Sequence, residues 1–234
     1  MDDFTLVDKK ISICGKSNCG KSRLLKYLIE CEIDKFDKIY CFSGTESVNA
    51  YFTNPDSGIL PKNQCFDEYD DEWLGRLMQT MIQMNGKKAN KDKKHVLVIL
   101  DDIAADPSSA LHTSKNFKKL CTMGRHCNIA LICTSQAVTL VPPVFRTNID
   151  HCFVGQLNNK SVELMADEYC CNISKKQFIK MYENSTQNYY FLMYDNRNKE
   201  SNKDINCIYS KIRVPDWYVK KEEDIFNKDD EDDF

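Results

Sequence analysis

The chain has 234 residues, 42% of them hydrophobic, and a net charge of −3. Such a composition suits one α/β domain with a sizeable core and excludes wholesale disorder. No stretch reaches the roughly 18 apolar residues that a membrane helix needs, and the N-terminus lacks the basic start and apolar run of a signal peptide. We therefore expect an intracellular protein without membrane contact.

The charge is unevenly distributed along the chain. Residues 221–234 hold eight acids and two lysines, a local charge of −6, which leaves the rest near +3. A body near +3 is not as basic as a general nucleic-acid coat protein. Any nucleic-acid contact must therefore come from a local patch or from a ring of subunits, and we expect residues 220–234 to form a disordered acidic tail.

The twelve cysteines are scattered, without a C-x-x-C pair. Cys121, His126 and Cys127 could be imagined as zinc ligands, but a second Cys/His cluster at metal-site spacing is missing. We therefore interpret the cysteines as reduced thiols, several of them small apolar core residues.

The first half of the chain predicts a strand, a glycine loop and a helix, followed by further elements. Strands are expected at Ile11–Cys14 and Lys38–Phe42, and a helix at Asp71–Met84. The helix behind the glycine loop is indicated by apolar residues on one face: Leu24, Leu25, Leu28 and Ile29. Residues 53–65 look like a loop and residues 85–94 like a polar, lysine-rich connection.

The second half predicts a mainly parallel sheet. Val96–Leu100 and Ile129–Cys133 are continuous apolar runs, which suit parallel strands covered on both faces. The remaining expected strands are His151–Leu157, Tyr189–Tyr194 and Ile208–Val214, of which the last two are candidates for a hairpin. The expected helices are Asn116–Met123, Ser161–Tyr169 and Lys175–Glu183. This alternation of strands and helices indicates an α/β fold with a central sheet flanked by helices.

The glycine loop fits the phosphate-binding motif G-x-x-x-x-G-K-[ST] at every fixed position. Glycines let the backbone approach the phosphates, and the following helix directs its positive end at the anion. Lys21 should reach the β- and γ-phosphates, and the Ser22 hydroxyl should coordinate Mg²⁺. The predicted nucleotide-binding residues are Gly15, Lys16, Ser17, Asn18, Cys19, Gly20, Lys21 and Ser22.

Polar residues follow two of the buried strands at the edge where α/β sheets bind ligands. Asp101 is placed to hold Mg²⁺ through water, and Asp102 could act as general base on the attacking water. Either could instead cap the next helix. Gln136 could orient water or sense the γ-phosphate, or simply be a polar residue that leaves a strand.

Two arginines are candidates for a finger that reaches a neighbouring subunit's nucleotide. Arg125 precedes the Ile129–Cys133 strand, and Arg146 follows a Pro-Pro turn. An arginine in this role stabilises the charge of the transition state. A surface salt bridge is the alternative for each.

Four motifs in order carry a family resemblance: GKSNCGKS, VLVILDD, GRHCNIALICTSQ and PPVFRTNIDHCFVG. They resemble those of the genome-packaging ATPases of large nucleocytoplasmic DNA viruses and virophages, in the FtsK–HerA superfamily. The resemblance spans roughly residues 8–170. It implies a RecA/FtsK-like fold, with the strand that carries the sensor glutamine between the P-loop and Walker B strands.

The resemblance also implies a function. Such proteins are ring-forming motors, pentamers or hexamers, that move double-stranded DNA into a capsid with ATP and Mg²⁺. It makes Arg125 the favoured trans-acting arginine, with Arg146 second. We expect a single ATPase domain over residues 1–219, with a motor core at 8–170 and closing elements at 171–219.

The expected partners are double-stranded DNA, other copies of the chain and a capsid or portal protein, at an assembly site in the host cytoplasm or on the virion. Lys115, Lys118 and Lys119 are candidates for DNA phosphate contacts. The lysines of residues 87–94 could form a second basic ring, although solubility is the favoured role. The acidic tail could dock on a portal or mimic DNA, but a solubilising role is favoured.

Other functions remain as alternatives. A small-molecule kinase would need an arginine-rich lid, and arginine is scarce. A GTP switch reads guanine through N-K-x-D, which the nearest segment, residues 159–162, lacks. A helicase-type DNA motor of similar fold is separated poorly from a packaging motor by sequence.

Overall fold

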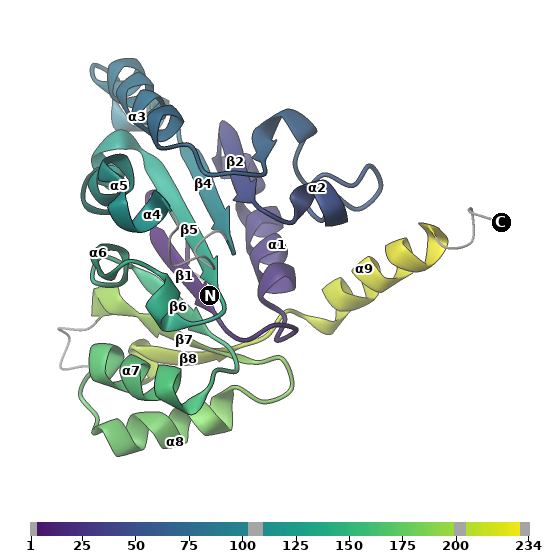
Figure 1. Cartoon of the computed structure of the whole chain (residues 1–234), viewed down its shortest axis with the longest axis vertical. Coiled ribbons are helices and arrows are strands. Elements are labelled where there is room, and N and C mark those ends of the chain that lie inside the picture. The colour runs from purple at the N-terminus through teal and green to yellow at the C-terminus, as the bar shows by residue number, and fades with distance from the viewer. Residues whose placement is uncertain (1–3, 103–109, 199–204, 230–234) are drawn as a thin grey trace.

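The computed structural model describes residues 4–102, 110–198 and 205–229. Its strands form one sheet in the order β3-β2-β4-β5-β1-β6-β7-β8 (Figure 1). The strands from β3 to β6 in this order run parallel, and β7 and β8 are antiparallel. The strands are β1 (Lys10–Cys14), β2 (Lys38–Ser43), β3 (Cys65–Phe66), β4 (Val96–Asp101), β5 (Ile129–Ser135), β6 (His151–Val154), β7 (Phe191–Asp195) and β8 (Tyr209–Ile212). The predicted α/β fold is confirmed, and β5 lies between β1 and β4 as expected.

Helices cover both faces of the sheet (Figure 1). One apolar cluster joins a face of the sheet to α3, α5, α7 and α8, and a second joins the other face to α1 and the start of α9. The helices are α1 (Lys21–Glu32), α2 (Glu46–Asn49), α3 (Asp71–Asn85), α4 (Ala110–Thr113), α5 (Lys115–Cys127), α6 (Pro143–Arg146), α7 (Asn159–Tyr169), α8 (Lys175–Ser185) and α9 (Asp216–Asp229).

The two clusters explain why the central strands are continuously apolar. In β4, Val96, Val98 and Leu100 belong to the first cluster, while Leu97 and Ile99 belong to the second. Successive side chains of a strand point to opposite faces, so a strand covered on both sides must be apolar at every position.

The register of the strands determines where the candidate site lies. Cys14 of β1 pairs with Ser135 of β5, and Leu100 of β4 pairs with Cys133 of β5. The residues that follow these three strands therefore leave the sheet at the same edge, which we call the carboxyl edge.

Two of the strand boundaries that differ from the prediction lie next to the phosphate loop. Strand β7 begins at Phe191, not Tyr189, because Asn188 and Tyr189 adopt left-handed backbone angles (φ 54° and 61°). Strand β6 ends at Val154, since the chain then turns so that the Gln156 carbonyl accepts a hydrogen bond from Lys16 N–H at 2.6 Å. In both places the residues outside the strand lie next to the phosphate loop.

The segment before β5 is more helical than predicted. Helix α5 continues to Cys127, so Arg125 lies in its last turn and not in a connection. Asn128 ends the helix in a left-handed conformation (φ 54°), which asparagine tolerates better than most residues. The short edge strand β3 lies within and after the stretch that was expected to be only a loop.

The acidic tail was expected to start at residue 220, but helix α9 runs from Asp216 to Asp229. Tyr218 and Glu222 are buried, and Glu222 accepts a hydrogen bond from Arg23 Nε in α1 at 2.8 Å. The expected boundary therefore falls inside a helix that is anchored on α1. Residues 230–234 lie outside the described residues.

Candidate nucleotide site at the carboxyl edge

The phosphate loop is held between β1, β5 and the turn after β6. Gly15 N–H donates to the Ser135 carbonyl at 3.0 Å. A Cβ on Gly15 would lie 2.5 Å from Cys19 Sγ, so any other residue there would displace the Cys19 side chain. Gly20 has φ 92°, a conformation that glycine adopts without steric cost. The motif glycines thus satisfy local constraints of the loop.

Helix α1 begins unlike the other long helices that support the sheet. It has no side-chain cap, and its first turn, like those of α5, α7 and α8, has no acidic residue. In α3, α5, α7 and α8 a side chain accepts a hydrogen bond from a backbone N–H: Asp70, Ser114, Asn158 and Ser174 respectively. The first-turn N–H groups of α1 and its positive end therefore suit an anion such as a phosphate.

The carboxylate of Asp101 lies at the end of β4 and is buried, with 7% of the residue exposed. It accepts hydrogen bonds from the Thr134 hydroxyl at 2.7 Å and the Ser43 hydroxyl at 3.3 Å. Burial raises the pKa of Asp101, and the neighbouring Asp102 raises it further, while Thr134 and Ser43 oppose the shift. A cation nearby would favour the ionised form of this carboxylate.

Gln136 connects the phosphate loop to the second carboxylate. Its Oε1 accepts a hydrogen bond from Ser17 Oγ at 3.1 Å, and its Nε2 donates to Asp102 Oδ2 at 3.4 Å. Asp102 itself has a left-handed backbone (φ 50°), and its N–H donates to Thr134 Oγ1 at 2.9 Å. The structure therefore brings Gln136, Asp102 and the loop together, as the sequence predicts.

These residues fit a nucleotide with Mg²⁺. The side chain of Lys21 is nearly buried and donates to the Lys16 carbonyl in a long hydrogen bond of 3.4 Å. Asp102 Oδ1 is buried and has no hydrogen-bond partner among the described residues. Over the same residues no group of three or more His, Cys, Asp and Glu could hold a metal. Mg²⁺ is commonly held by one or two protein oxygens together with phosphates, and Ser22 and Asp101 are the residues that would hold it here.

Thr134 and Ser43 were not among the site residues predicted from the sequence. Thr134 contacts both acids, because its hydroxyl donates to Asp101 and accepts from the Asp102 N–H. Both residues end strands at the carboxyl edge, which is the signal that could have indicated them. Short hydroxyl side chains at strand ends are too common to be distinctive.

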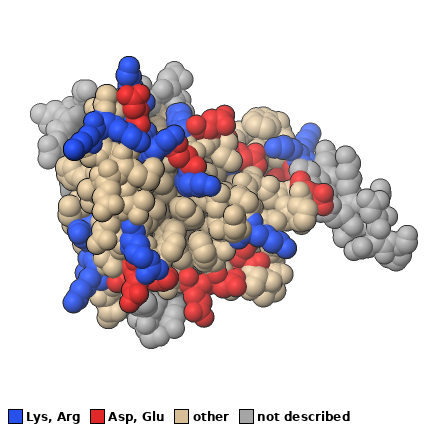
Figure 2. Space-filling view, turned by 90° about the horizontal axis from the view of Figure 1, so that it is seen from above, with Lys and Arg blue, Asp and Glu red and all other residues tan. Residues whose placement is uncertain are grey.

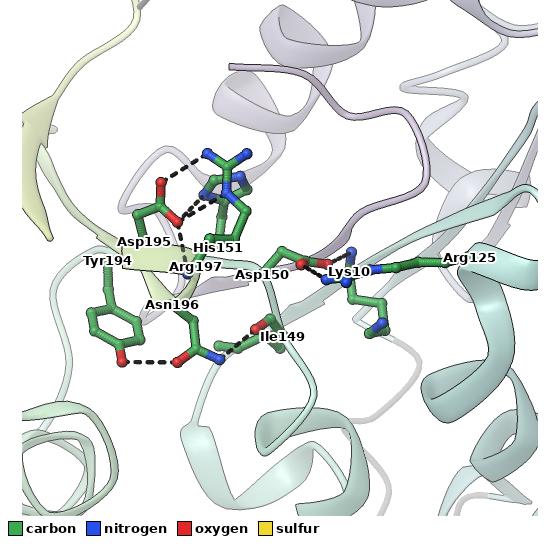
Figure 3. Close-up of polar contacts among 9 residues, drawn as sticks. All are labelled: Lys10, Arg125, Ile149, Asp150, His151, Tyr194, Asp195, Asn196 and Arg197. Atoms are coloured by element: carbon green, nitrogen blue, oxygen red, sulfur yellow. Dashed lines mark hydrogen bonds and ion pairs between the residues drawn. The ribbon is translucent and has the colours of Figure 1, made fainter. Parts of the chain in front are cut away.

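Arg125 lies at the opposite, amino edge of the sheet, where β1 and β6 begin. Its guanidinium forms an ion pair with Asp150, whose Oδ2 accepts from the backbone N–H of Lys10 at 2.8 Å (Figure 3). The Arg125 side chain is 56% exposed, whereas Asp150 is buried. Arg125 is therefore remote from the phosphate loop of its own chain, and its role at a neighbour's site stays a prediction.

Arg146 is engaged within its own chain. It forms an ion pair with Glu168 of α7, with Nη2 at 2.8 Å and Nε at 3.0 Å from Oε1. Its Nη1 donates to the Val141 carbonyl at 2.7 Å. These bonds occupy the guanidinium and fix α6 against α7, so they argue against the second predicted arginine finger.

The candidate DNA-binding lysines, Lys115, Lys118 and Lys119, are exposed on α5. The lysine-rich connection of residues 86–94 precedes β4 at the amino edge, and its Lys94 forms an ion pair with Asp37 at 2.5 Å. On the face in Figure 2, basic side chains lie among acidic ones. That face therefore has a mixed charge and not a field of one sign.

The fold and this site are those of a P-loop ATPase: a phosphate loop after β1, acids after β4 and a glutamine after the intervening β5. The sequence matches the family described as "Poxvirus A32 protein" over residues 2–225. The chain therefore belongs to the poxvirus A32 protein family. This confirms the predicted resemblance to viral packaging ATPases.

Two curated relatives come from iridoviruses. The uncharacterized protein 075L of Invertebrate iridescent virus 6 is 28% identical over 203 residues, which cover 86% of this chain and 76% of the relative. The uncharacterized protein 015R of Frog virus 3 is 23% identical over 201 residues, which cover 86% of this chain and 60% of the relative. The chain thus spans less than two thirds of the second relative.

Solved structures confirm the fold. The genome packaging NTPase B204 from Sulfolobus turreted icosahedral virus 2, in complex with AMP, matches with a TM-score of 0.63 and 18% identity, covering 91% of this chain and all of that one. The pCW3 conjugation coupling protein TcpA matches with a TM-score of 0.60 and 14% identity, covering 92% of this chain and 66% of that one. Among the described residues, no helix is both long and apolar enough for a membrane span.

Proposed function

We propose that this protein is an ATP-driven translocase that packages double-stranded viral DNA into a capsid. The observation that carries the proposal is the convergence of Lys21, Asp101, Asp102 and Gln136 on one edge of the sheet, in a chain of the A32 family. The proposal of genome packaging rests on B204, which shares the fold and is described as a genome packaging NTPase. Host cytoplasm is the proposed place of assembly.

The residues divide the hydrolytic work. The loop N–H groups and Lys21 bind and orient the phosphates, and Ser22 and Asp101 would hold Mg²⁺, which would supply positive charge against the phosphates. Asp102 accepts a proton from the attacking water, and Gln136 orients that water. Because Gln136 also bonds Ser17 of the phosphate loop, it is placed to respond to an occupied loop.

DNA would be contacted by lysines of a ring of subunits. Lys115, Lys118 and Lys119 lie on α5, whose first turn follows the chain that leaves Asp102. The part of that connection at residues 103–109 lies outside the described residues.

The main test measures phosphate release with and without double-stranded DNA. We expect stimulation by double-stranded DNA and a much smaller effect of single strands, which separates packaging from a helicase that loads on single strands. A kinase would instead transfer phosphate to a small acceptor and ignore DNA. Hydrolysis that no DNA changes, under conditions where the protein assembles, would contradict the proposal.

The shared site is tested by mixing inactive subunits. Arg125→Ala and Lys21→Ala each remove one half of a site, so mixed rings contain some sites with both halves. We expect the mixture to regain hydrolysis that neither variant has alone. Native mass spectrometry would establish that mixed rings form, and mixed rings without recovered activity would exclude Arg125 as the trans-acting group.

A further inference from the structure

A hollow of about 570 Å³ opens beside the phosphate loop, on the side away from the hydrolytic acids. It begins at Gly20, Lys21 and Ser22 and continues to residues far along the chain: Tyr51, Tyr189, Arg213 and Val219. Asp101, Asp102 and Gln136 do not line it. A triphosphate whose γ end faces these acids would direct its other end into this hollow.

The size and lining of the hollow suit a nucleoside. Small-molecule sites typically enclose about 300–1,000 Å³ and combine apolar and aromatic walls with a few polar groups. Here Phe191, Val214 and Val219 supply apolar surface, and Arg213 and Asp216 form an ion pair at the same hollow. Asp216 therefore balances the positive charge of Arg213 before any ligand binds.

Tyr189 presents an aromatic ring with no ring partner among the described residues. It is 66% exposed, unlike the nearly buried Phe191 that follows it in the hollow. A Cβ on Gly20 would lie 3.5 Å from Tyr189 Cδ1, so the ring borders the last glycine of the phosphate loop. Its neighbour Tyr190 has a different role, because Lys211 Nζ lies 4.2 Å from that ring's centre.

The far wall is fixed relative to the phosphate loop. Val219 belongs to α9, and Glu222 of the same helix is buried and bonded to Arg23 Nε at 2.8 Å. Lys26 Nζ, also on α1, lies 3.4 Å from Glu222. Helix α9 is thus anchored on the helix that carries Lys21 and Ser22, which keeps the hollow open beside the loop.

We propose that this hollow takes the nucleoside of the bound nucleotide and that the base stacks on Tyr189. The inference rests on the proposed nucleotide site and deepens it, since it names the group that binds the base. Bases stack on aromatic side chains whatever their hydrogen-bonding edge, and loss of such a platform weakens binding about tenfold or more.

The test compares ATP with inorganic tripolyphosphate, which has the phosphates and lacks the nucleoside. The variant Tyr189→Asn removes the ring and suits the left-handed backbone at this position (φ 61°), so it should fold as well as the wild type. We expect it to bind Mg²⁺-ATP about tenfold more weakly and tripolyphosphate unchanged, by calorimetry. Tyr189→Phe keeps the ring and should bind both ligands like the wild type.

Two controls separate this inference from the site itself. Trp217 is similarly exposed at 63% but does not line the hollow, so Trp217→Leu should leave both affinities unchanged. Lys21→Ala should lose both ligands. Equal ATP affinity in Tyr189→Asn and the wild type would overturn the inference and leave the proposed phosphate site intact. An equal loss of affinity for both ligands in Tyr189→Asn would have the same meaning. A wild type that binds neither ligand would overturn both.

Discussion

The two edges of the sheet use charged side chains in different ways. At the carboxyl edge, Lys21 makes one long hydrogen bond, Asp101 is buried with a raised pKa, and Asp102 has a buried oxygen without a partner among the described residues. At the amino edge, Asp150 is paired with Arg125 and with a backbone N–H. The carboxyl edge is therefore arranged for a charged ligand, while the charge of Asp150 at the amino edge is already paired within the chain.

This difference has a consequence for mutations. Substitutions at the carboxyl edge should reduce hydrolysis and leave the fold intact or more stable. The reason is that the site contains groups that hydrolysis requires but that are unfavourable for folding. Substitutions among the paired groups elsewhere should reduce stability and leave the chemistry of the site unchanged. Arg125 is the exception that the shared-site proposal requires, since it is paired within its chain and needed by another.

The largest effect is expected for Asp101→Asn. Loss of the carboxylate should reduce Mg²⁺-dependent phosphate release about a thousandfold. The same change should raise the unfolding midpoint, because the pKa of Asp101 is raised and its ionised form is therefore unfavourable in the fold. Thermal unfolding and phosphate release measure the two effects. The exposed Asp167→Asn is the control, and a lowered midpoint in Asp101→Asn would contradict the account.

Removing the Arg146 side chain should lower the stability of the fold. Arg146→Ala leaves Glu168 without its partner and frees the Val141 carbonyl, at a cost of about 3 kcal/mol in the free energy of unfolding. Urea unfolding measures this cost. Phosphate release per folded molecule should remain that of the wild type. A folded Arg146→Ala protein without hydrolysis would restore Arg146 as a candidate finger.

Gln136→Ala tests the link between the loop and the base. It removes the bonds to Ser17 and Asp102, and we expect about a hundredfold slower hydrolysis with ATP affinity nearly unchanged. The exposed Gln83→Ala is the matched control in single-turnover measurements. If Gln136→Ala lost ATP affinity and kept its rate of hydrolysis, the residue would serve binding alone.

The smallest effect is a pH dependence at the amino edge. His151 lies beside Asp195 at this edge (Figure 3), and burial lowers its pKa to about 4 from 6.5. Because the unfolded chain binds this proton more readily, stability is full above pH 6.5 and is lost as the pH falls towards 4. The loss by pH 5 is about 2 kcal/mol. His151→Phe should abolish this part of the pH dependence of unfolding, whereas an unchanged profile would exclude His151 as its source.

Much of the site could be predicted because its motif is local and its edge follows from strand order. The phosphate loop is contiguous, and Asp101 and Gln136 end apolar runs that had to be parallel strands. The partners of the two arginines could not be predicted in the same way. Arg125 and Asp150 are 25 residues apart, and Arg146 and Glu168 are 22 apart, so only the folded packing pairs them.

The start of the tail shows what composition alone does not reveal. Its acids outweigh its apolar residues, which is typical of disorder. Nevertheless Tyr218 and Glu222 face α1 and are buried there, so a few contacts order the start of a segment whose average composition predicts none. The hollow beside Tyr189 was also missed, because its lining comes from widely separated parts of the chain.

The most direct test of the central claim is DNA-stimulated phosphate release by the wild type and Lys21→Ala, with Lys35→Ala as control. Lys35 follows the far end of α1, where it forms an ion pair with Glu32. The account predicts that double-stranded DNA accelerates hydrolysis in the wild type and in Lys35→Ala, and that Lys21→Ala hydrolyses no ATP with or without DNA. Wild-type hydrolysis rates in Lys21→Ala would contradict it.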